Sequence, residues 1–195
     1  MRLLFVFFFS ISLLSACRNT GTVESDGDLA GYTLEKIDGS AFQRAYKMEG
    51  ERLIEEGSVL DGKKNGEWVS YHSDIKGFPK VIANYVEGKL SGPYMEINEY
   101  GQFQVVAQYR NNKLHGRVAK FQYTRIAEEL HYKEGILHGP YTAFFPNSDV
   151  KQRSAEFKNG LEDGVTRFYN EQGKITMEYQ YKNGEKVSGG MVSEE

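Results

Sequence analysis

The sequence predicts an all-β protein built from tandem β-hairpins of about 24 residues each. Three observations predict it. The 195 residues include 13 Tyr, 12 Phe and 21 Gly but only 4 Pro, which is typical of many short strands joined by tight turns. One pattern recurs along most of the chain at a nearly constant spacing. The segments between its turns alternate apolar and polar residues, and no helical apolar stripe follows residue 33.

The first 16 residues have the features of a secretory signal. Arg2 supplies a positive charge, and the apolar run that follows it is too short to span a bilayer comfortably. The run ends in Leu14-Ser15-Ala16-Cys17, which resembles the bacterial lipobox. That resemblance implies cleavage before Cys17, lipidation of its sulfur and membrane attachment through several acyl chains. A plain secretory signal with an incidental cysteine is the alternative, but Cys17 is the only cysteine and cannot form an internal disulfide.

We therefore expect a lipid-anchored protein of the bacterial cell envelope. Arg18 stands where an Asp would favour the inner membrane, which favours the outer membrane in a Gram-negative source. Removing residues 1–16 removes the charge of Arg2 and changes the formal net charge from −3 to −4, which gives no case for nucleic-acid binding. Residues 17–32 form the acylated cysteine and a flexible tether rich in Gly, Ser, Thr and Asp.

The repeat occupies residues 58–190, between a capping hairpin expected at 33–57 and an acidic tail at 191–195. Five segments align without gaps, and a sixth is truncated. They are "VLDGKKNGEW", "YVEGKLSGPY", "YRNNKLHGRV", "YKEGILHGPY", "FKNGLEDGVT" and "YKNGEKVSGG", beginning at Val59, Tyr85, Tyr109, Tyr132, Phe157 and Tyr181. Positions within each unit are counted below from these start residues.

Glycines hold fixed positions in every unit. Position +3 is Gly except at Asn112, and pairs such as Asp61-Gly62 and Asn159-Gly160 are strong signals of a hairpin turn. Position +7 is also Gly in the first five units, where a glycine within a strand indicates a bulge or a close approach of neighbouring backbone. A second turn closes most units, near Gly77, Gly101, Asn147-Ser148 and Gly173. The third unit lacks that glycine, so its "YTRIAEEL" is expected to form a longer or irregular connection.

This pattern of Tyr, Gly, Gly and an aromatic residue resembles MORN repeats, in the form found in bacterial proteins often described as antitoxin-like. The resemblance covers roughly residues 57–190. It implies an elongated, twisted, largely single-layer antiparallel sheet made of successive hairpins, and it implies no particular reaction. MORN arrays are associated with protein contacts and in some cases with lipid.

No catalytic or metal-binding constellation stands out. His115 and His138 share position +6 in adjacent units, but neither Cys nor a carboxylate recurs with them to complete a ligand set. The carboxylate pairs are typical of solvated faces, and no nucleophile elbow, phosphate loop or HExxH motif occurs. We therefore expect no enzymatic activity, no cofactor and no metal.

Two sets of side chains are candidates for partner binding. The first is a basic stripe at position +1 that could meet lipid phosphates or an acidic partner, although ordinary lysine decoration of a soluble sheet is the alternative. It consists of Arg110, Lys133, Lys158 and Lys182. The second is the aromatic set Trp68, Tyr94 and Tyr141 at +9, which would either line a peptide groove or pack as the core of the sheet.

These observations favour a monomeric, membrane-anchored envelope protein whose repeats bind or scaffold an unidentified protein partner. One alternative is an antitoxin-like immunity protein that neutralises a toxin at the envelope, which adjacency to a toxin gene would support. The other alternative is a surface protein that binds anionic lipid. An enzyme is the least favoured hypothesis, and turnover in a hydrolase screen would revive it.

Overall fold

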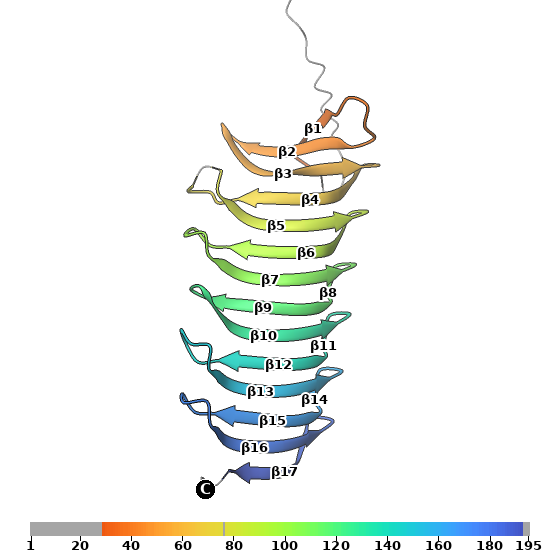
Figure 1. The fold of residues 1–195 in the computed structure, drawn as a ribbon. Coiled ribbons are helices and arrows are strands. Elements are labelled where there is room, and N and C mark those ends of the chain that lie inside the picture. The colour runs from red at the N-terminus through yellow and green to blue at the C-terminus, as the bar shows by residue number, and fades with distance from the viewer. Residues whose placement is uncertain (1–28, 76, 193–195) are drawn as a thin grey trace, which may run out of the picture.

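The protein, described here from a computed structural model over residues 29–75 and 77–192, is one open antiparallel sheet of 17 strands without a helix in this part of the chain. Successive strands pair in chain order as hairpins, so the sheet is a single elongated layer (Figure 1). The strands are β1 (Thr33–Lys36), β2 (Gln43–Glu49), β3 (Arg52–Leu60), β4 (Lys63–Tyr71), β5 (Pro79–Val86), β6 (Lys89–Ile97), β7 (Phe103–Arg110), β8 (Lys113–Leu114), β9 (Gly116–Gln122), β10 (Arg125–Lys133), β11 (Ile136–Leu137), β12 (Gly139–Phe144), β13 (Lys151–Lys158), β14 (Leu161–Glu162), β15 (Gly164–Tyr169), β16 (Ile175–Lys182) and β17 (Glu185–Met191). The predicted all-β sheet of tandem hairpins is confirmed. The signal segment, Cys17 and residues 18–28 lie outside the described residues.

A two-residue turn joins the two halves of each repeat unit along one edge of the sheet, which we call the hairpin edge. Both turn residues have positive φ, as at Asp61 (51°) and Gly62 (71°) or Asn159 (54°) and Gly160 (85°). Positive φ at both positions defines a type I′ turn, whose twist matches that of the flanking strands. The one unit without Gly at +3 has Asn112 with φ 66°, and its Oδ1 accepts the backbone N–H of Leu90 at 2.7 Å.

The same turns connect each unit to the preceding one. The backbone N–H at +3 donates to the backbone carbonyl at +5 of the previous unit, as from Gly88 to Lys64 at 2.8 Å and from Gly160 to Leu137 at 2.8 Å. Five such hydrogen bonds recur along the described chain at 2.8–2.9 Å. They continue the sheet past the bulges, so every unit contacts its neighbours in the same way.

The glycines at +7 form the bulges that the sequence predicts. Gly92 has φ 107° and lies opposite Tyr109 of the next unit, while a Cβ on it would come 3.0 Å from Nδ2 of Asn84. Gly164 has φ 138°, and a Cβ there would meet the side chain of Glu156 at 2.9 Å. Positive φ disfavours a side chain at every +7 position, and crowding adds to this at Gly92, Gly139 and Gly164.

Replacing Gly92 with Ala is therefore expected to lower the free energy of unfolding by about 1–3 kcal/mol, because an L-residue is strained in this conformation. Urea unfolding followed by circular dichroism measures the change. The matched control is Gly190→Ala, since Gly190 has no positive φ and a Cβ there would meet nothing within 4 Å. Equal stability losses in the two variants would contradict the role assigned to the bulge.

The core is a row of alternating small and large side chains along one face, which we call the aromatic face. Cross-strand partners succeed one another across six strands as Ala45, Gly57, Trp68, Ala83, Tyr94 and Ala107. A Cβ on Gly57 would overlap the ring of Trp68, so the largest side chain lies directly on the smallest residue. Val118, Leu130 and Ala155 extend the buried row through the later units.

The predicted tether, residues 17–32, extends too far, because its last residues, 29–32, pack onto the sheet. Leu29, placed in the tether by the sequence analysis, is 3 % exposed and belongs to the cluster that contains Leu34 and Trp68. The hydroxyl of Tyr32 donates to Oε2 of Glu55 at 2.5 Å, and its ring lies 5.4 Å from that of Trp68. Apolar residues at the end of a polar segment thus pack over the first unit and cap it, together with β1.

The connection after the third unit is shorter than expected. Only residues 123–124 join β9 to β10, whereas 98–102 and 145–150 form the neighbouring connections along this second edge, which we call the loop edge. Tyr123 adopts φ 57° without a glycine, and the strand register shifts between Ile126 and Glu128. Of the two outcomes expected from the missing glycine, a longer connection is wrong and an irregular one is confirmed, since the chain makes a tight turn followed by a bulge. At the other end of the chain β17 includes Met191, so the expected tail loses its first residue to the sheet.

Candidate functional site

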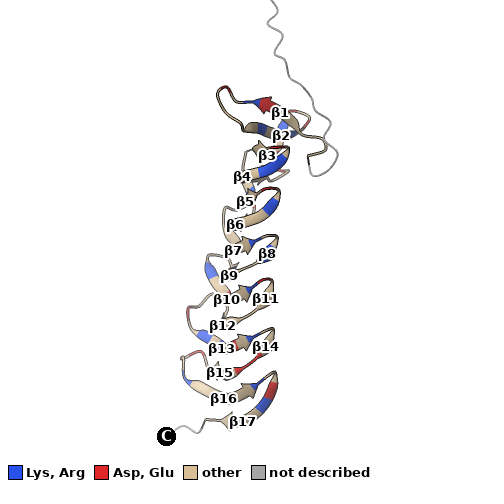
Figure 2. Cartoon of the chain, turned by 90° about the vertical axis from the view of Figure 1, so that its right-hand side faces the viewer, with Lys and Arg blue, Asp and Glu red and all other residues tan. Residues whose placement is uncertain are grey.

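The hairpin edge carries a continuous line of cations. Position +1 pairs with position +4 across each turn, as in Val86 with Lys89 and Arg110 with Lys113. The predicted stripe at +1 is therefore joined by lysines at +4, which extend it through the first units. We call the combined set the basic edge; Figure 2, which faces this side of the molecule, shows Lys and Arg at successive turns, with Asp and Glu also present in the turns. It consists of Lys63, Lys89, Arg110, Lys113, Lys133, Lys158 and Lys182.

Most of the basic edge lacks a bound counter-charge. Arg110 lies 3.8 Å from Glu134, and Lys182 lies 3.1 Å from Asp163. Within residues 29–75 and 77–192, the other five lysines have no carboxylate oxygen within 4.0 Å of their Nζ atoms. Because two strands separate equivalent residues, these charges recur about every 10 Å along the sheet.

The aromatic set at +9 belongs to the core. Trp68 is 2 % exposed, and its indole N–H donates to the carbonyl of Ser58 at 3.0 Å. The ring centroids of Tyr94 and Tyr109 lie 5.3 Å apart, and those of Tyr141 and Phe157 lie 5.9 Å apart, with both pairs of rings edge-on. The structure therefore gives Trp68 no surface for a partner, because Tyr32 of the cap and Tyr85 of the next unit cover its ring. Tyr94 and Tyr141 are half-buried and serve the same packing.

The most exposed aromatic side chains lie along the loop edge instead. Tyr100 is 79 % exposed and Tyr123 is 67 % exposed, and Phe103 is exposed next to the ring of Phe121, 6.1 Å away. Sequence reasoning missed these residues because Tyr100 and Tyr123 fall in connections and Phe103 at the first position of β7, all outside the repeated positions. A signal was present, since the connection "NEYGQ" places an aromatic residue at a turn tip, where burial is not expected.

Carboxylates between the strands are held in their charged form by hydrogen bonds. Nζ of Lys120 lies 2.9 Å from Glu128, which also accepts from the hydroxyl of Tyr141 at 3.1 Å. The hydrogen bond from Lys120 lowers the pKa of Glu128, and that from Arg117 lowers the pKa of Glu129. Burial, followed by the hydrogen bond to Glu56, raises the pKa of Tyr71 to about 12. These groups stabilise the sheet and do not form an acid–base pair facing an open site.

We expect acid to destabilise the sheet through these carboxylates. A carboxyl group whose pKa is lowered by folding stabilises the protein above its unfolded-state pKa, and that contribution is lost as the pH falls through the lower, folded-state pKa. The urea midpoint should therefore decline below about pH 4.5, the ordinary value for Glu. Glu128→Gln should reduce this decline, whereas Glu171→Gln, in an exposed loop, should leave it unchanged. A decline that is the same in wild type and Glu128→Gln would contradict the assignment.

The described residues contain no group of three or more His, Cys, Asp or Glu side chains placed to hold a metal ion. His115 contacts Glu134 at 3.2 Å, and Nδ1 of His138 accepts the backbone N–H of Asn159 at 3.4 Å, so these equivalent histidines each bind the next turn. No helix in the described part of the chain is long and apolar enough to cross a membrane.

The chain is a repeat protein made of a single sheet, with Lys and Arg side chains along its hairpin edge and exposed aromatic side chains along its loop edge. Neither a model of a known protein family nor a curated protein matches the chain. Among solved structures, it is similar to a mutant of S. aureus TarM in complex with fondaparinux, alpha-GlcNAc-glycerol and UDP, with 10 % identity and a TM-score of 0.28. That match covers 81 % of this chain and 21 % of the other, so the chain spans about a fifth of that protein's length. A likeness this weak carries no argument about fold or activity.

Proposed function

We propose that this protein is a lipid-anchored contact module of the bacterial envelope, whose repeat sheet binds a protein partner along its loop edge. The observation that carries the proposal is the row of exposed aromatic side chains at that edge, Tyr100, Phe103 and Tyr123. Aromatic residues are enriched at protein interfaces, where they bury a large rigid surface at a low cost in conformational entropy.

The architecture supports a role in contact. A single-layer sheet has little enclosed volume for a substrate, but it offers two faces and two edges to partners. The repeat pattern resembles MORN repeats, which are associated with protein contacts, and the lipobox-like Cys17 would hold the sheet at a membrane. Fold-level analogy alone does not specify function, so the loop edge provides the specific argument.

Photo-crosslinking in envelope preparations tests this proposal. A photoreactive amino acid replaces Tyr100 in one full-length variant and Val86, exposed at the hairpin edge, in a matched control. We expect one discrete crosslinked protein from position 100 and none from position 86. Abundant proteins captured equally at both positions, or no crosslink at position 100, would count against the loop edge as the contact surface.

The basic edge favours a second candidate, binding to an anionic membrane surface. In the described structure, five lysines with no carboxylate oxygen within 4.0 Å of their Nζ atoms lie on one edge of a protein that is acidic overall. A lysine close to an anionic leaflet contributes about 1 kcal/mol, and salt screens the attraction. Such binding would lay the hairpin edge along the membrane and turn the loop edge away from it.

Vesicle flotation distinguishes this candidate. In a Cys17→Ser background, which removes the proposed anchor, replacing Lys63, Lys89 and Lys113 with Gln should weaken binding to phosphatidylglycerol vesicles by about two orders of magnitude. Replacing Lys80, Lys151 and Lys174 with Gln removes the same charge from exposed positions away from this edge. If both triple variants lost the same binding to these vesicles, the binding would depend only on net charge and not on the basic edge, and this candidate would be wrong.

A further inference from the structure

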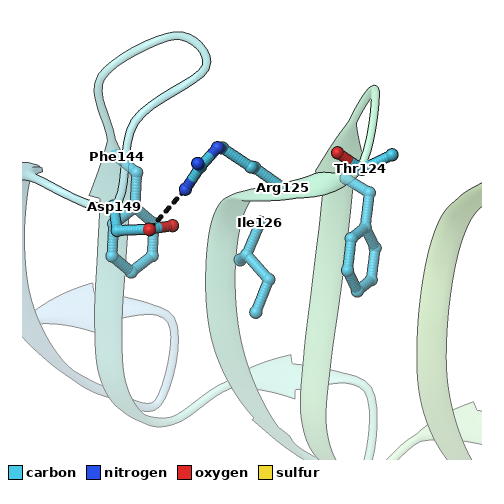
Figure 3. Close-up of a pocket in the computed structure, with 6 residues that line it drawn as sticks. Thr124, Arg125, Ile126, Phe144 and Asp149 are labelled. Atoms are coloured by element: carbon cyan, nitrogen blue, oxygen red, sulfur yellow. Dashed lines mark hydrogen bonds and ion pairs between the residues drawn. The ribbon is translucent and has the colours of Figure 1, made fainter.

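An open pocket interrupts the loop edge between the third and fourth units. It has a volume of about 530 Å³ and is lined by Phe121, Thr124, Arg125, Ile126, Phe144 and Asp149. Three of these side chains are large and apolar, and Figure 3 shows Ile126 below Arg125, with Phe144 on the adjacent strand beside Asp149, which forms an ion pair with Arg125. The volume falls within the range of about 300–1,000 Å³ that is usual for ligand sites.

The short turn at residues 123–124 creates this pocket. Elsewhere the connections stack on one another, with Phe78 close to Gly101 in one pair and Val150 close to Gly173 in another. Between these two stacks, only residues 123–124 join β9 to β10, whereas five and six residues form the connections before and after them. The pocket lies where this short turn is followed by the longer connection 145–150, and Phe121 and Phe144 line it.

The rim of the pocket carries a cation with unused hydrogen-bonding capacity. Nη1 of Arg125 contacts Oδ2 of Asp149, but Nε and Nη2 have no acceptor within the described residues. Asp149 is 82 % exposed at its side chain, so this ion pair is a surface pair that contributes little to stability. A guanidinium group binds a carboxylate by donating two parallel N–H hydrogen bonds. The unused Nε and Nη2 of Arg125 can therefore donate to a second carboxylate.

We infer that this pocket binds a protein segment in which an aromatic side chain is followed directly by a carboxylate residue. This inference rests on the proposed contact function and names the site and the chemistry of the partner. The rings of Phe121 and Phe144 offer edge and face contacts to an incoming ring. Arg125 supplies the charge complementary to the carboxylate, and exposed Tyr123 extends the apolar surface beside the pocket.

Nuclear magnetic resonance titration of the full-length, ¹⁵N-labelled protein tests the inference with defined probes. Acetyl-Phe-Asp-amide should cause saturable amide shifts confined to residues 121–126 and 144–149. Acetyl-Phe-Asn-amide should bind about tenfold more weakly, because it lacks the charge-assisted hydrogen bond. Acetyl-Ala-Asp-amide should cause no saturable shift there. Equal affinities of the Asp and Asn probes, or saturation by the Ala probe, would overturn the assignment.

Two variants and a control test the two parts of the site. Arg125→Gln should abolish the preference for Asp over Asn. Replacing residues 123–124 with the five residues of the 98–102 connection should close the gap and abolish binding, while the amide spectrum of distant strands shows that the sheet stays folded. Arg52→Gln, at the same edge but beside β2, should leave all affinities unchanged. Retained binding in the loop-lengthened variant would contradict the pocket.

The outcomes also separate this inference from the function on which it rests. If Tyr100 crosslinks to a partner while the dipeptide probes do not bind, the pocket assignment is wrong and the contact function stands. If the dipeptide binds as expected but no partner crosslinks anywhere along the loop edge, the pocket stands and the contact function is wrong.

Discussion

Replacing Trp68 with Ala should lower the free energy of unfolding by about 3–5 kcal/mol, the range measured for aromatic residues removed from well-packed cores. The indole is buried and lies edge-on between Tyr32 at 5.4 Å and Tyr85 at 6.3 Å. Its neighbours on the adjacent strands are Gly57 and Ala83, which cannot expand into the space it leaves. The carbonyl of Ser58 also loses its hydrogen bond from the indole.

Circular dichroism during urea unfolding measures this loss, since the variant lacks the only tryptophan and gives no indole fluorescence. Tyr100→Ala is the control, because it removes an aromatic side chain that is largely exposed. We expect that control to change stability by less than about 0.5 kcal/mol. A loss below about 1 kcal/mol for Trp68→Ala would show that the cap and the first unit do not depend on this residue.

Replacing Glu55 with Leu should lower the free energy of unfolding by about 1–3 kcal/mol, because it leaves a largely desolvated cation without its carboxylate. Nζ of Lys64 lies 2.8 Å from Glu55 and 4.0 Å from the ring centroid of Trp68. With the ring of Trp68, the rings of Tyr32 and Tyr85 surround the ammonium group on three sides, and Nζ lies 5.2 and 5.3 Å from their centroids. Contact with aromatic faces stabilises the cation but does not replace the ion pair.

The repeat itself supplies the compensating change. The position of Lys64 is occupied by Leu90, Leu114 and Leu137 in the next three units, where leucine packs beside the same kind of ring. Lys64→Leu together with Glu55→Leu should therefore recover most of the stability that Glu55→Leu loses. A double-mutant cycle measured by urea unfolding gives the coupling between the two residues. Additive effects of the two substitutions would show that the pair is not coupled through this aromatic box.

The repeated positions made most of the fold predictable. A type I′ turn needs positive φ at two successive residues, so Asp-Gly and Asn-Gly pairs mark it in the sequence. The +7 glycines could be assigned to bulges for a similar reason, since a strand retains a glycine where no side chain fits. These rules are local, and they apply wherever the same residues recur at the same spacing.

Features that depend on which residues become neighbours in space, within a unit or between units, were less predictable. Leu29 and Tyr32 follow a polar segment, and only the exposed end of the first unit gives them a surface to cover. The basic stripe was found at +1, but its continuation through Lys63 and Lys89 depends on the register that pairs +1 with +4. The pocket depends on a difference in length between neighbouring connections, which no single segment displays.

The hydrogen bonds from each +3 amide to the preceding +5 carbonyl have an evolutionary consequence. Because every junction uses the same contacts, a gene segment that encodes one unit can be duplicated or deleted between two turns without creating a new kind of interface. The number of units, and with it the distance from the capped end to the far end, can therefore change in whole steps during evolution. The short turn at residues 123–124 is different in this respect, since its pocket also uses Phe144 and Asp149 of the following unit and would be inherited only as a block of two adjacent units.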